Sequence, residues 1–231
     1  MLSAQEYTSA LAAATQKSIL APFPERVRRS VLDSTRRIDL PAKAYLRRPG
    51  EPERFGLVVR GLVRALHVTA EGHELTTHWC HPGAIINALT LTGHDPGLYI
   101  QAVTASVWCD FHVDTVRRIL QTDVESAWLA LAVLEERLRR SIEEVALFAY
   151  GDLRTRMGRK LLDIACREPD ARLIARVTQE ELASGVAAAR PSVAKILGEF
   201  RRAGVIQTTR DGIVVLKPEA LLRHPRRVEA A

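Results

Sequence analysis

The stretch TQEELASGVAAARPSVAKILGEFRRAGVIQTTRDGIVVL, residues 178–216, decides the fold of the last third of the chain. It opens on Thr178 followed three residues later by Glu181, the spacing of a capping box that starts a helix. Pro191 would break a helix from within, but at the first helical position its missing N–H and fixed φ are harmless. We therefore predict two short helices joined by AAA (187–189), the second beginning at Arg190-Pro191.

The second of these helices has two different faces. Val193, Ile196, Leu197 and Phe200 recur at i, i+3, i+4 and i+7, which predicts the buried stripe. The opposite, cationic face carries Arg190, Ser192, Lys195, Gly198 and Arg202. Residues 205–216 then predict two short strands around Asp211-Gly212, a strong hairpin signal. Helix, turn, helix and hairpin make a winged helix-turn-helix, which lays its second helix in the DNA major groove.

Side-chain chemistry suggests a role for each candidate DNA contact. Arg190 can bind guanine O6 and N7 together, and Lys195 can reach a base acceptor or a phosphate. Ser192 suits either a phosphate or a base edge. Thr178 and Gln179 begin the preceding helix, and helix N-termini attract phosphate, so we expect them to hold the DNA backbone. A merely solvated charge is the alternative for Lys195.

The charge distribution supports the same end of the chain. Residues 1–150 carry 17 Lys+Arg and 17 Asp+Glu, whereas residues 151–231 carry 16 and 10, so the whole net charge of +6 lies in the last third. Such asymmetry favours a phosphate-bearing partner, although a basic surface that only aids solubility would look alike.

A long helix is predicted upstream, from a cap at Asp123 to about Tyr150, before Gly151-Asp152 end it and start a further helix over 153–165. Apolar residues follow one another in steps of three and four, as in a coiled coil. We expect a homodimer seam there, with a helix packed only on its own chain as the alternative. The seam positions are Val124, Ala127, Leu131, Leu134, Leu138, Ser141, Val145 and Phe148.

The N-terminal half has a different pattern of apolar and turn residues. Residues 24–37 predict a short helix, and from Ile38 to about Val113 short β-type runs alternate with turn residues, which indicates a small sandwich or barrel. We expect an α+β protein of three parts: a β-barrel at 1–122, a dimerisation helix at 123–150 and a DNA-binding domain at 151–231.

Several motifs together resemble one family. LVVRGLVRAL followed by TAEGHEL, the segment HPGAIINAL, the long helix, the Asp152 hinge and the helix-turn-helix are similar to the cyclic AMP receptor protein and fumarate-nitrate reduction regulator (Crp/Fnr) family of bacterial transcription factors, from about Val31 to Leu216. The resemblance implies a cyclic-nucleotide-binding-type β jelly roll, a homodimer, palindromic double-stranded DNA as ligand, and contact with RNA polymerase.

The resemblance weakens at the effector pocket. Nucleotide-binding members carry a Gly-Glu-Leu turn whose Glu holds the ribose, and an Arg-Ser pair that binds the cyclic phosphate. The matching positions here are Asn87-Ala88-Leu89 and Pro96-Gly97, and losing two charged hydrogen bonds weakens binding by roughly 10²- to 10⁴-fold. We expect an effector other than cyclic AMP, or none. Ser141 lies where relatives touch the base, or is simply a small seam residue.

Other cofactors are judged from cysteine and histidine. No cysteine precedes Cys80, so an iron–sulfur cluster is not expected. The segment HWCH, residues 78–81, leaves a haem or other small-molecule sensor as the alternative function, beside the interpretation of ordinary histidines. Three widely spaced cysteines favour a reducing compartment over a disulfide framework. No metal site is predicted.

Two further classes are excluded on sequence grounds. There is no nucleophile–base set, paired carboxylate pocket or Gly-rich phosphate loop, so we do not expect an enzyme. No apolar run approaches the roughly 18 residues of a membrane span, and the N-terminus does not look like a signal peptide. We expect a cytoplasmic protein.

Overall fold

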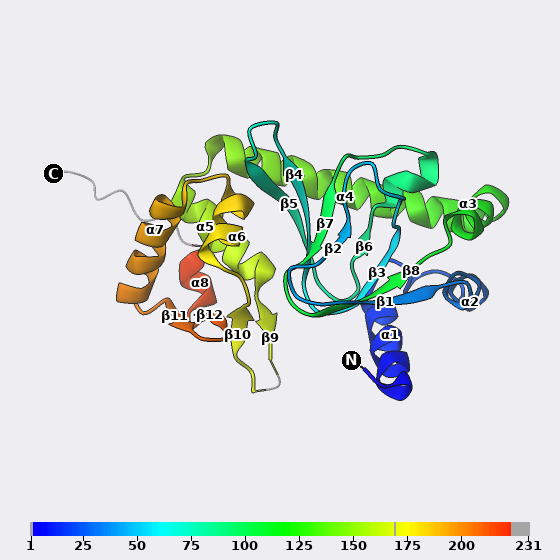
Figure 1. Cartoon of the computed structure of the whole chain (residues 1–231), viewed down its shortest axis with the longest axis horizontal. Helices are drawn as coiled ribbons and strands as arrows, with labels where there is room; N and C mark the ends of the chain where they lie inside the picture. The colour runs from blue at the N-terminus through cyan, green and yellow to red at the C-terminus, as the bar shows by residue number, and fades with distance from the viewer. Residues whose placement is uncertain (1, 169, 223–231) are drawn as a thin grey trace. The chain divides into compact units, whose positions relative to one another are not determined.

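The computed structural model describes residues 2–168 and 170–222, and the chain divides into two compact units, Met1–Ser141 and Ile142–Ala231. Figure 1 shows their helices and strands.

The N-terminal unit is built on two four-stranded antiparallel sheets. One sheet has the order β1 (Arg36–Leu40), β8 (Ser106–Asp110), β3 (Gly56–Arg60) and β6 (Ile85–Ile86). The other has the order β2 (Tyr45–Arg47), β7 (Tyr99–Ala102), β4 (Val63–Val68) and β5 (Glu74–Cys80). The expected jelly roll of the cyclic-nucleotide-binding type is confirmed.

Strand β3 lies between two packed layers, which explains why residues 56–59, GLVV, are apolar without a break. Successive side chains of a strand point to opposite faces. Val58 packs into the core between the sheets, while Leu57 and Val59 pack against helices α1 (Ala4–Lys17) and α2 (Glu25–Asp33). Both faces of the strand are therefore covered.

The helix predicted over 24–37 is correct up to Asp33 and wrong in its last four residues. Helix α2 ends at Asp33, and Arg36 already belongs to β1. The hydroxyls of Ser34 and Thr35 donate to the carbonyls of Val31 and Leu32, at 3.2 and 2.7 Å, which satisfies the carbonyls at the helix end. Helices α1 and α3 (Val113–Thr122) and the 3-10 helix η1 (Ala88–Thr92) were not predicted from the sequence.

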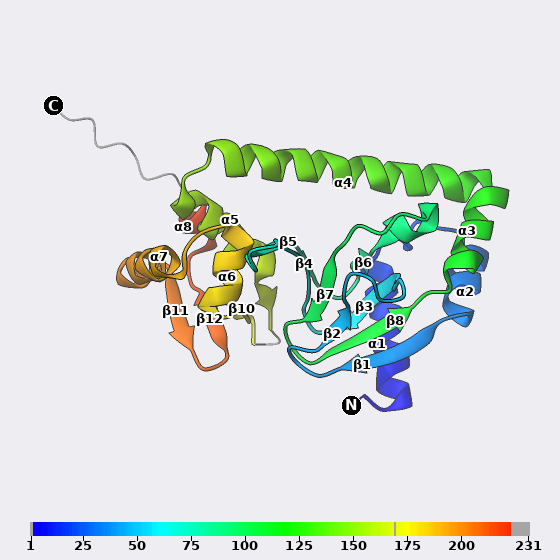
Figure 2. The ribbon, with the colours of Figure 1, turned by 45° about the horizontal axis from the view of Figure 1, so that its top comes forward.

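Helix α4 (Val124–Tyr150) runs for 27 residues and is the longest helix in Figure 2. It begins directly after Asp123 and ends directly before Gly151, as predicted. One row of its apolar side chains is exposed in the single chain, with fractions of 51% for Leu131, 58% for Leu134, 60% for Leu138 and 67% for Val145.

The C-terminal unit combines short helices with one antiparallel sheet of order β11-β12-β10-β9. Its elements are α5 (Leu153–Ile164), β9 (Cys166–Arg167), β10 (Leu173–Ala175), α6 (Gln179–Val186), α7 (Arg190–Arg202), β11 (Ile206–Thr209), β12 (Gly212–Val215) and α8 (Pro218–Leu221). The predicted winged helix-turn-helix is confirmed, whereas β9 and β10 were not predicted.

The wing turns one residue earlier than expected. Thr209 pairs with Gly212, so the loop consists of Arg210 and Asp211. Gly212 has a φ of +139°, and a Cβ at this position would lie 2.5 Å from the Ala175 carbonyl oxygen on β10. Only glycine fits where the hairpin meets the rest of the sheet.

Candidate DNA-binding interface

The first helix of the motif starts as its capping box predicts. The Thr178 hydroxyl accepts a hydrogen bond from the Glu181 backbone N–H at 3.2 Å, and the Glu181 carboxylate accepts one from the Thr178 N–H at 2.7 Å. Glu181 is only 5% exposed, so this reciprocal pair fixes the start of α6 inside the unit. Thr178 is exposed and Gln179 half-buried at the helix start.

The connection to α7 is short and strained. Ala187 takes the left-handed conformation, with φ 50° and ψ 55°, which costs a residue with a Cβ roughly 1 kcal/mol. Ala189 is the N-cap of α7 and offers no side-chain hydrogen bond, while Pro191 lies in the first helical turn. The helix therefore starts at Arg190-Pro191, as predicted, with Pro191 as its second residue, but it lacks a polar cap.

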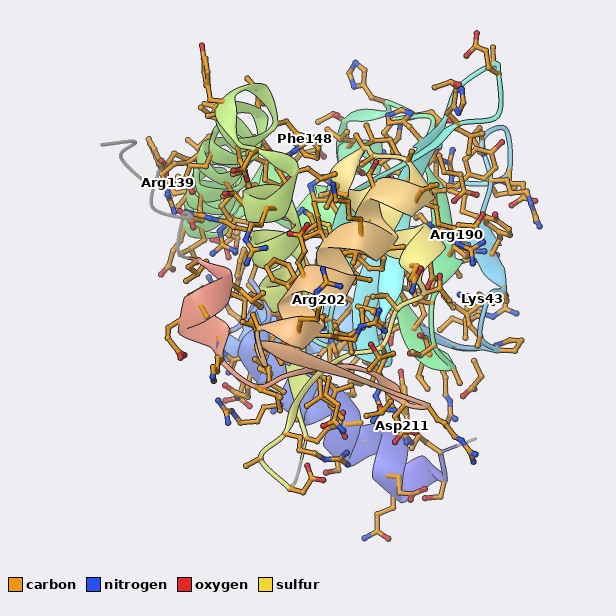
Figure 3. The ribbon with its side chains drawn as sticks, turned by 90° about the vertical axis from the view of Figure 1, so that its left-hand side faces the viewer. Lys43, Arg139, Phe148, Arg190, Arg202 and Asp211 are labelled. Carbon is orange, nitrogen blue, oxygen red and sulfur yellow. The ribbon has the colours of Figure 1, made fainter. Side chains whose placement is uncertain are left out.

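Packing on one side of α7 leaves its other side free. Val193, Leu197 and Phe200 are buried in the unit and Ile196 is half-buried. The side chains of Arg190, Ser192, Lys195 and Arg202 are exposed and Gly198 is half-buried. Figure 3 shows Arg190 and Arg202 at the two ends of this helix.

The cations on the exposed face of α7 have no carboxylate partner in the described part of the chain. Over residues 2–168 and 170–222, none of Arg190, Lys195 and Arg202 has a carboxylate at ion-pair distance. Unpaired, exposed cations on a helix of a winged helix-turn-helix are suited to phosphates and base edges.

Sequence reasoning missed two further cations in this unit. Arg154, on α5, donates to Glu199 of α7 at 3.0 Å and stacks over the Phe200 ring at 4.5 Å. It lines a shallow depression of about 380 Å³ together with Asp152, Ser192, Lys195, Ile196 and Glu199. Arg210 is exposed in the wing loop. The signals were an arginine two residues after a helix cap and one inside a predicted hairpin turn.

The proposed effector positions belong to the N-terminal unit. Asn87 takes a left-handed conformation at the start of η1, and its amide donates to Glu53 at 2.6 Å and to the Arg54 carbonyl at 3.0 Å. Ala88 is half-buried and Leu89 is 52% exposed. Pro96 and Gly97 lie half-buried in the loop before β7, and Ser141 is exposed on α4.

A buried arginine connects these positions. Arg47 has no exposed side-chain surface and pairs with Glu53 at 2.6 Å and Asp95 at 2.7 Å. It also donates to the Leu98 carbonyl at 2.8 Å. The Gly97 N–H and then the Arg47 guanidinium hold the pKa of Asp95 below its usual range. We call Arg47, Glu53, Asp95 and Asn87 the Arg47 cluster.

The cysteines and histidines are placed as follows. Cys80 lies in the core between the two sheets, and burial raises the pKa of its thiol to about 12. Cys109 is also buried, Cys166 is exposed, and His78 is exposed on β5. Within the described part of the chain, no three His, Cys, Asp or Glu side chains are grouped so as to hold a metal ion. No described helix is both long and apolar enough to span a bilayer.

Comparison with known proteins agrees with this geometry. Residues 155–224 match the family of Crp-like helix-turn-helix domains. The transcriptional regulator SdrP of Thermus thermophilus is 27% identical over 164 residues, 69% of this chain and 78% of SdrP. The cAMP-activated global transcriptional regulator CRP of Escherichia coli O6:H1 is 26% identical over 183 residues, 76% of this chain and 87% of CRP.

Solved structures show the same architecture. The crystal structure of a CRP/FNR-family transcriptional regulator from Thermus thermophilus superimposes with a TM-score of 0.66 and 25% identity, covering 80% of this chain and 96% of that one. FixK2 from Bradyrhizobium japonicum, at 16% identity, shares the fold with a TM-score of 0.69 over 81% of this chain and 95% of that one.

A jelly roll, a long helix and a winged helix-turn-helix define a class of DNA-binding regulators. Within that class the resemblance seen in the sequence is confirmed: this chain is a DNA-binding transcriptional regulator of the Crp/Fnr type.

Proposed function

We propose that the chain acts as a homodimer that reads a palindromic DNA site with α7 and does so without cyclic AMP. The observation that carries this proposal is the exposed face of α7, whose Arg190, Lys195 and Arg202 have no carboxylate partner among the described residues. Arg190 contacts guanine, Lys195 a base or phosphate, and Ser192 a phosphate or base edge. Thr178 and Gln179 hold the DNA backbone, and Arg202 adds charge at the far end of α7.

The homodimer is supported by the exposed seam of α4. Leu131, Leu134, Leu138 and Val145 are all more than half exposed, a cost that a second copy removes by burying them. Trp128 and Ile142, exposed at 67% and 61%, widen the stripe beyond the predicted seam. Phe148 is half-buried at its end. A two-fold dimer places two copies of α7 on half-sites about one DNA turn apart, which is why the site is palindromic.

This function divides the chain into a sensor-like barrel at 1–122, a dimerisation helix at 123–150 and a DNA-binding domain at 151–231. Because its DNA ligand is chromosomal, we place the protein in the cytoplasm, and regulation of transcription makes RNA polymerase its second partner.

The Arg47 cluster supports independence from cyclic AMP. Asn87-Ala88-Leu89 and Pro96-Gly97 lack the carboxylate and arginine that bind a cyclic nucleotide. The segment between them is tied down by Arg47, whose guanidinium already carries two carboxylates and one carbonyl. An anionic phosphate would have to displace Asp95 or Glu53 from it. No contact of the described residues favours haem, so we do not propose a haem sensor.

The test begins with DNA selected from random sequence by the full-length protein. We expect enrichment of a two-fold symmetric site, and affinity that falls about 10³-fold or more between roughly 50 and 200 mM salt, because phosphate contacts release counterions. Binding without salt dependence, or no enrichment of symmetric sites, would contradict the proposal. Cyclic AMP should change neither the DNA affinity nor the melting temperature.

A further inference from the structure

The corner between α4 and α5 is tightly built. The Gly151 N–H donates to the Leu147 carbonyl at 2.8 Å, and a Cβ on Gly151 would lie 2.5 Å from that oxygen. One residue on, the Asp152 carboxylate caps α5 by accepting from the Thr155 N–H at 2.7 Å. Both residues between α4 and α5 are therefore held by hydrogen bonds to the adjoining helices.

Two cations of α5 reach back across this corner to the end of α4. Lys160, 7% exposed, pairs with Glu144 at 3.2 Å, and Asp163 lies 3.8 Å from the same ammonium. Arg156 stacks its guanidinium over the Phe148 ring at 5.4 Å. The last two turns of α4 are thus fastened to α5, in agreement with the unit boundary at Ser141–Ile142.

The same Arg156 also reaches the helix-turn-helix. Its Nη1 donates to the Val186 carbonyl at 2.9 Å. Val186 is the last residue of α6, where carbonyls lack an intrahelical partner and the helix dipole is negative, so a cation is favoured there. The next residue, Ala187, is the left-handed turn that leads into α7.

We propose that Arg156 is a positioning residue that sets the placement of α7 relative to the dimer seam. A chain of direct contacts runs from Phe148, in the predicted seam, through Arg156 to Val186 and the turn before α7. A guanidinium can stack with its face while donating from its edge, whereas an ammonium cannot do both. This inference rests on the proposed function, since the placement matters only if two copies of α7 must fit two half-sites.

The test measures half-site spacing preference, which a residue that only stabilises the unit would not alter. The probes are the symmetric DNA selected by wild-type protein and the same DNA with the half-sites moved apart by about two base pairs. We expect Arg156→Lys to reduce the preference for the original spacing about tenfold, because the stacking contact is lost and the carbonyl contact weakened. Arg159→Lys, an exposed position on the same helix, is the matched control and should keep the preference.

Phe148→Leu provides a second route if Arg156→Lys fails to fold. It keeps an apolar seam but removes the ring face, so it should lower the same preference, and the double variant should lose less than the product of the single losses. Equal weakening on both DNAs, or an unchanged preference in both variants, would overturn the positioning role. A wild-type protein that is monomeric or has no spacing preference would instead contradict the proposed function, and this inference with it.

Discussion

Two arginine sites, one in each unit of this protein, differ in their partners. In the N-terminal unit Arg47 is fully buried and held between the carboxylates of Glu53 and Asp95. In the C-terminal unit Arg190 and Arg202 are exposed on α7, and no described carboxylate pairs with them.

The difference shows what an arginine needs in order to bind a phosphate. The buried Arg47 guanidinium has lost its water and donates to two carboxylates and one carbonyl, while its Nε has no hydrogen-bond partner among the described residues, so an external anion must displace a carboxylate to reach it. An exposed guanidinium carries neither cost. Under the proposed function, the charges of the Arg47 cluster disfavour an anionic nucleotide in the barrel, whereas the exposed face of α7 accepts DNA.

The largest effect is expected at the dimer seam, because two copies of α7 can bind a symmetric site together only if the dimer forms. Leu138→Glu places two carboxylates opposite each other in the symmetric interface, which should weaken dimerisation by about 10²-fold or more. Light scattering over a concentration series measures the effect, together with loss of affinity for symmetric DNA. Ala132→Glu adds the same charge at an exposed position outside the predicted seam and should leave the dimer intact.

The next largest effect is expected on removal of the buried Arg47 guanidinium. Arg47→Met leaves Glu53 and Asp95 facing each other without a cation, and we expect a loss of about 2–3 kcal/mol in the free energy of unfolding, lessened by their partial exposure. Urea unfolding measures it. If the variant is as stable as wild type, the Arg47 cluster does not stabilise the fold. Arg48→Met, at a neighbouring and exposed residue, is the control.

Arg190→Ala tests whether the exposed arginine at the start of α7 reads a base. Loss of a bidentate guanine contact should reduce affinity for the selected site by about 1–3 kcal/mol while affinity for random DNA changes much less. Lys195→Ala should weaken both to a similar degree if Lys195 contacts phosphate. Fluorescence anisotropy on both DNAs separates the two, and a uniform loss for Arg190→Ala would contradict base reading.

A smaller effect, a gain in stability, is expected at the turn that precedes α7. Ala187→Gly removes a Cβ from a left-handed residue, and Ala189→Ser supplies a hydroxyl at the helix N-cap. Each should raise the free energy of unfolding by about 0.5–1 kcal/mol. Thermal melting checks both, and neither should change DNA sequence preference. A lower melting temperature for Ala187→Gly would show that the turn is not strained.

The smallest effect concerns pH. The pKa of Asp95 is lowered in the folded chain, so its contribution to stability is present above the unfolded value, about 3.9, and is lost as pH falls through the lower folded value. Wild type should therefore melt higher than Asp95→Asn near neutral pH, with the difference shrinking below about pH 4. A difference that is constant down to about pH 2 would exclude this linkage.

Much of the DNA-binding unit could be predicted because its signals are local. The Thr178–Glu181 box and the Asp152 cap each act over three residues, and both are present in the structure. Pro191 and Gly212 constrain their own backbone, so their positions fix a helix start and a tight turn. Strands β9 and β10 escaped because their short segments pair only through tertiary contact with β12 and each other.

What the sequence by itself determined is therefore the long helix after Asp123, the helix after Asp152, the two helices and the wing hairpin of residues 178–216, and the helix face that carries the cations. Strands β9 and β10 and helix α8 were not predicted. Only the tertiary structure decided which arginines are paired inside the chain and which are exposed and able to bind an external anion. Arg47 meets Glu53 across a turn and Asp95 from a distant loop, and Arg156 meets Val186 thirty residues away. Capping and turn preferences depend on neighbours in the chain, whereas the neutralisation of a charge depends on which side chains the fold brings within ion-pair distance.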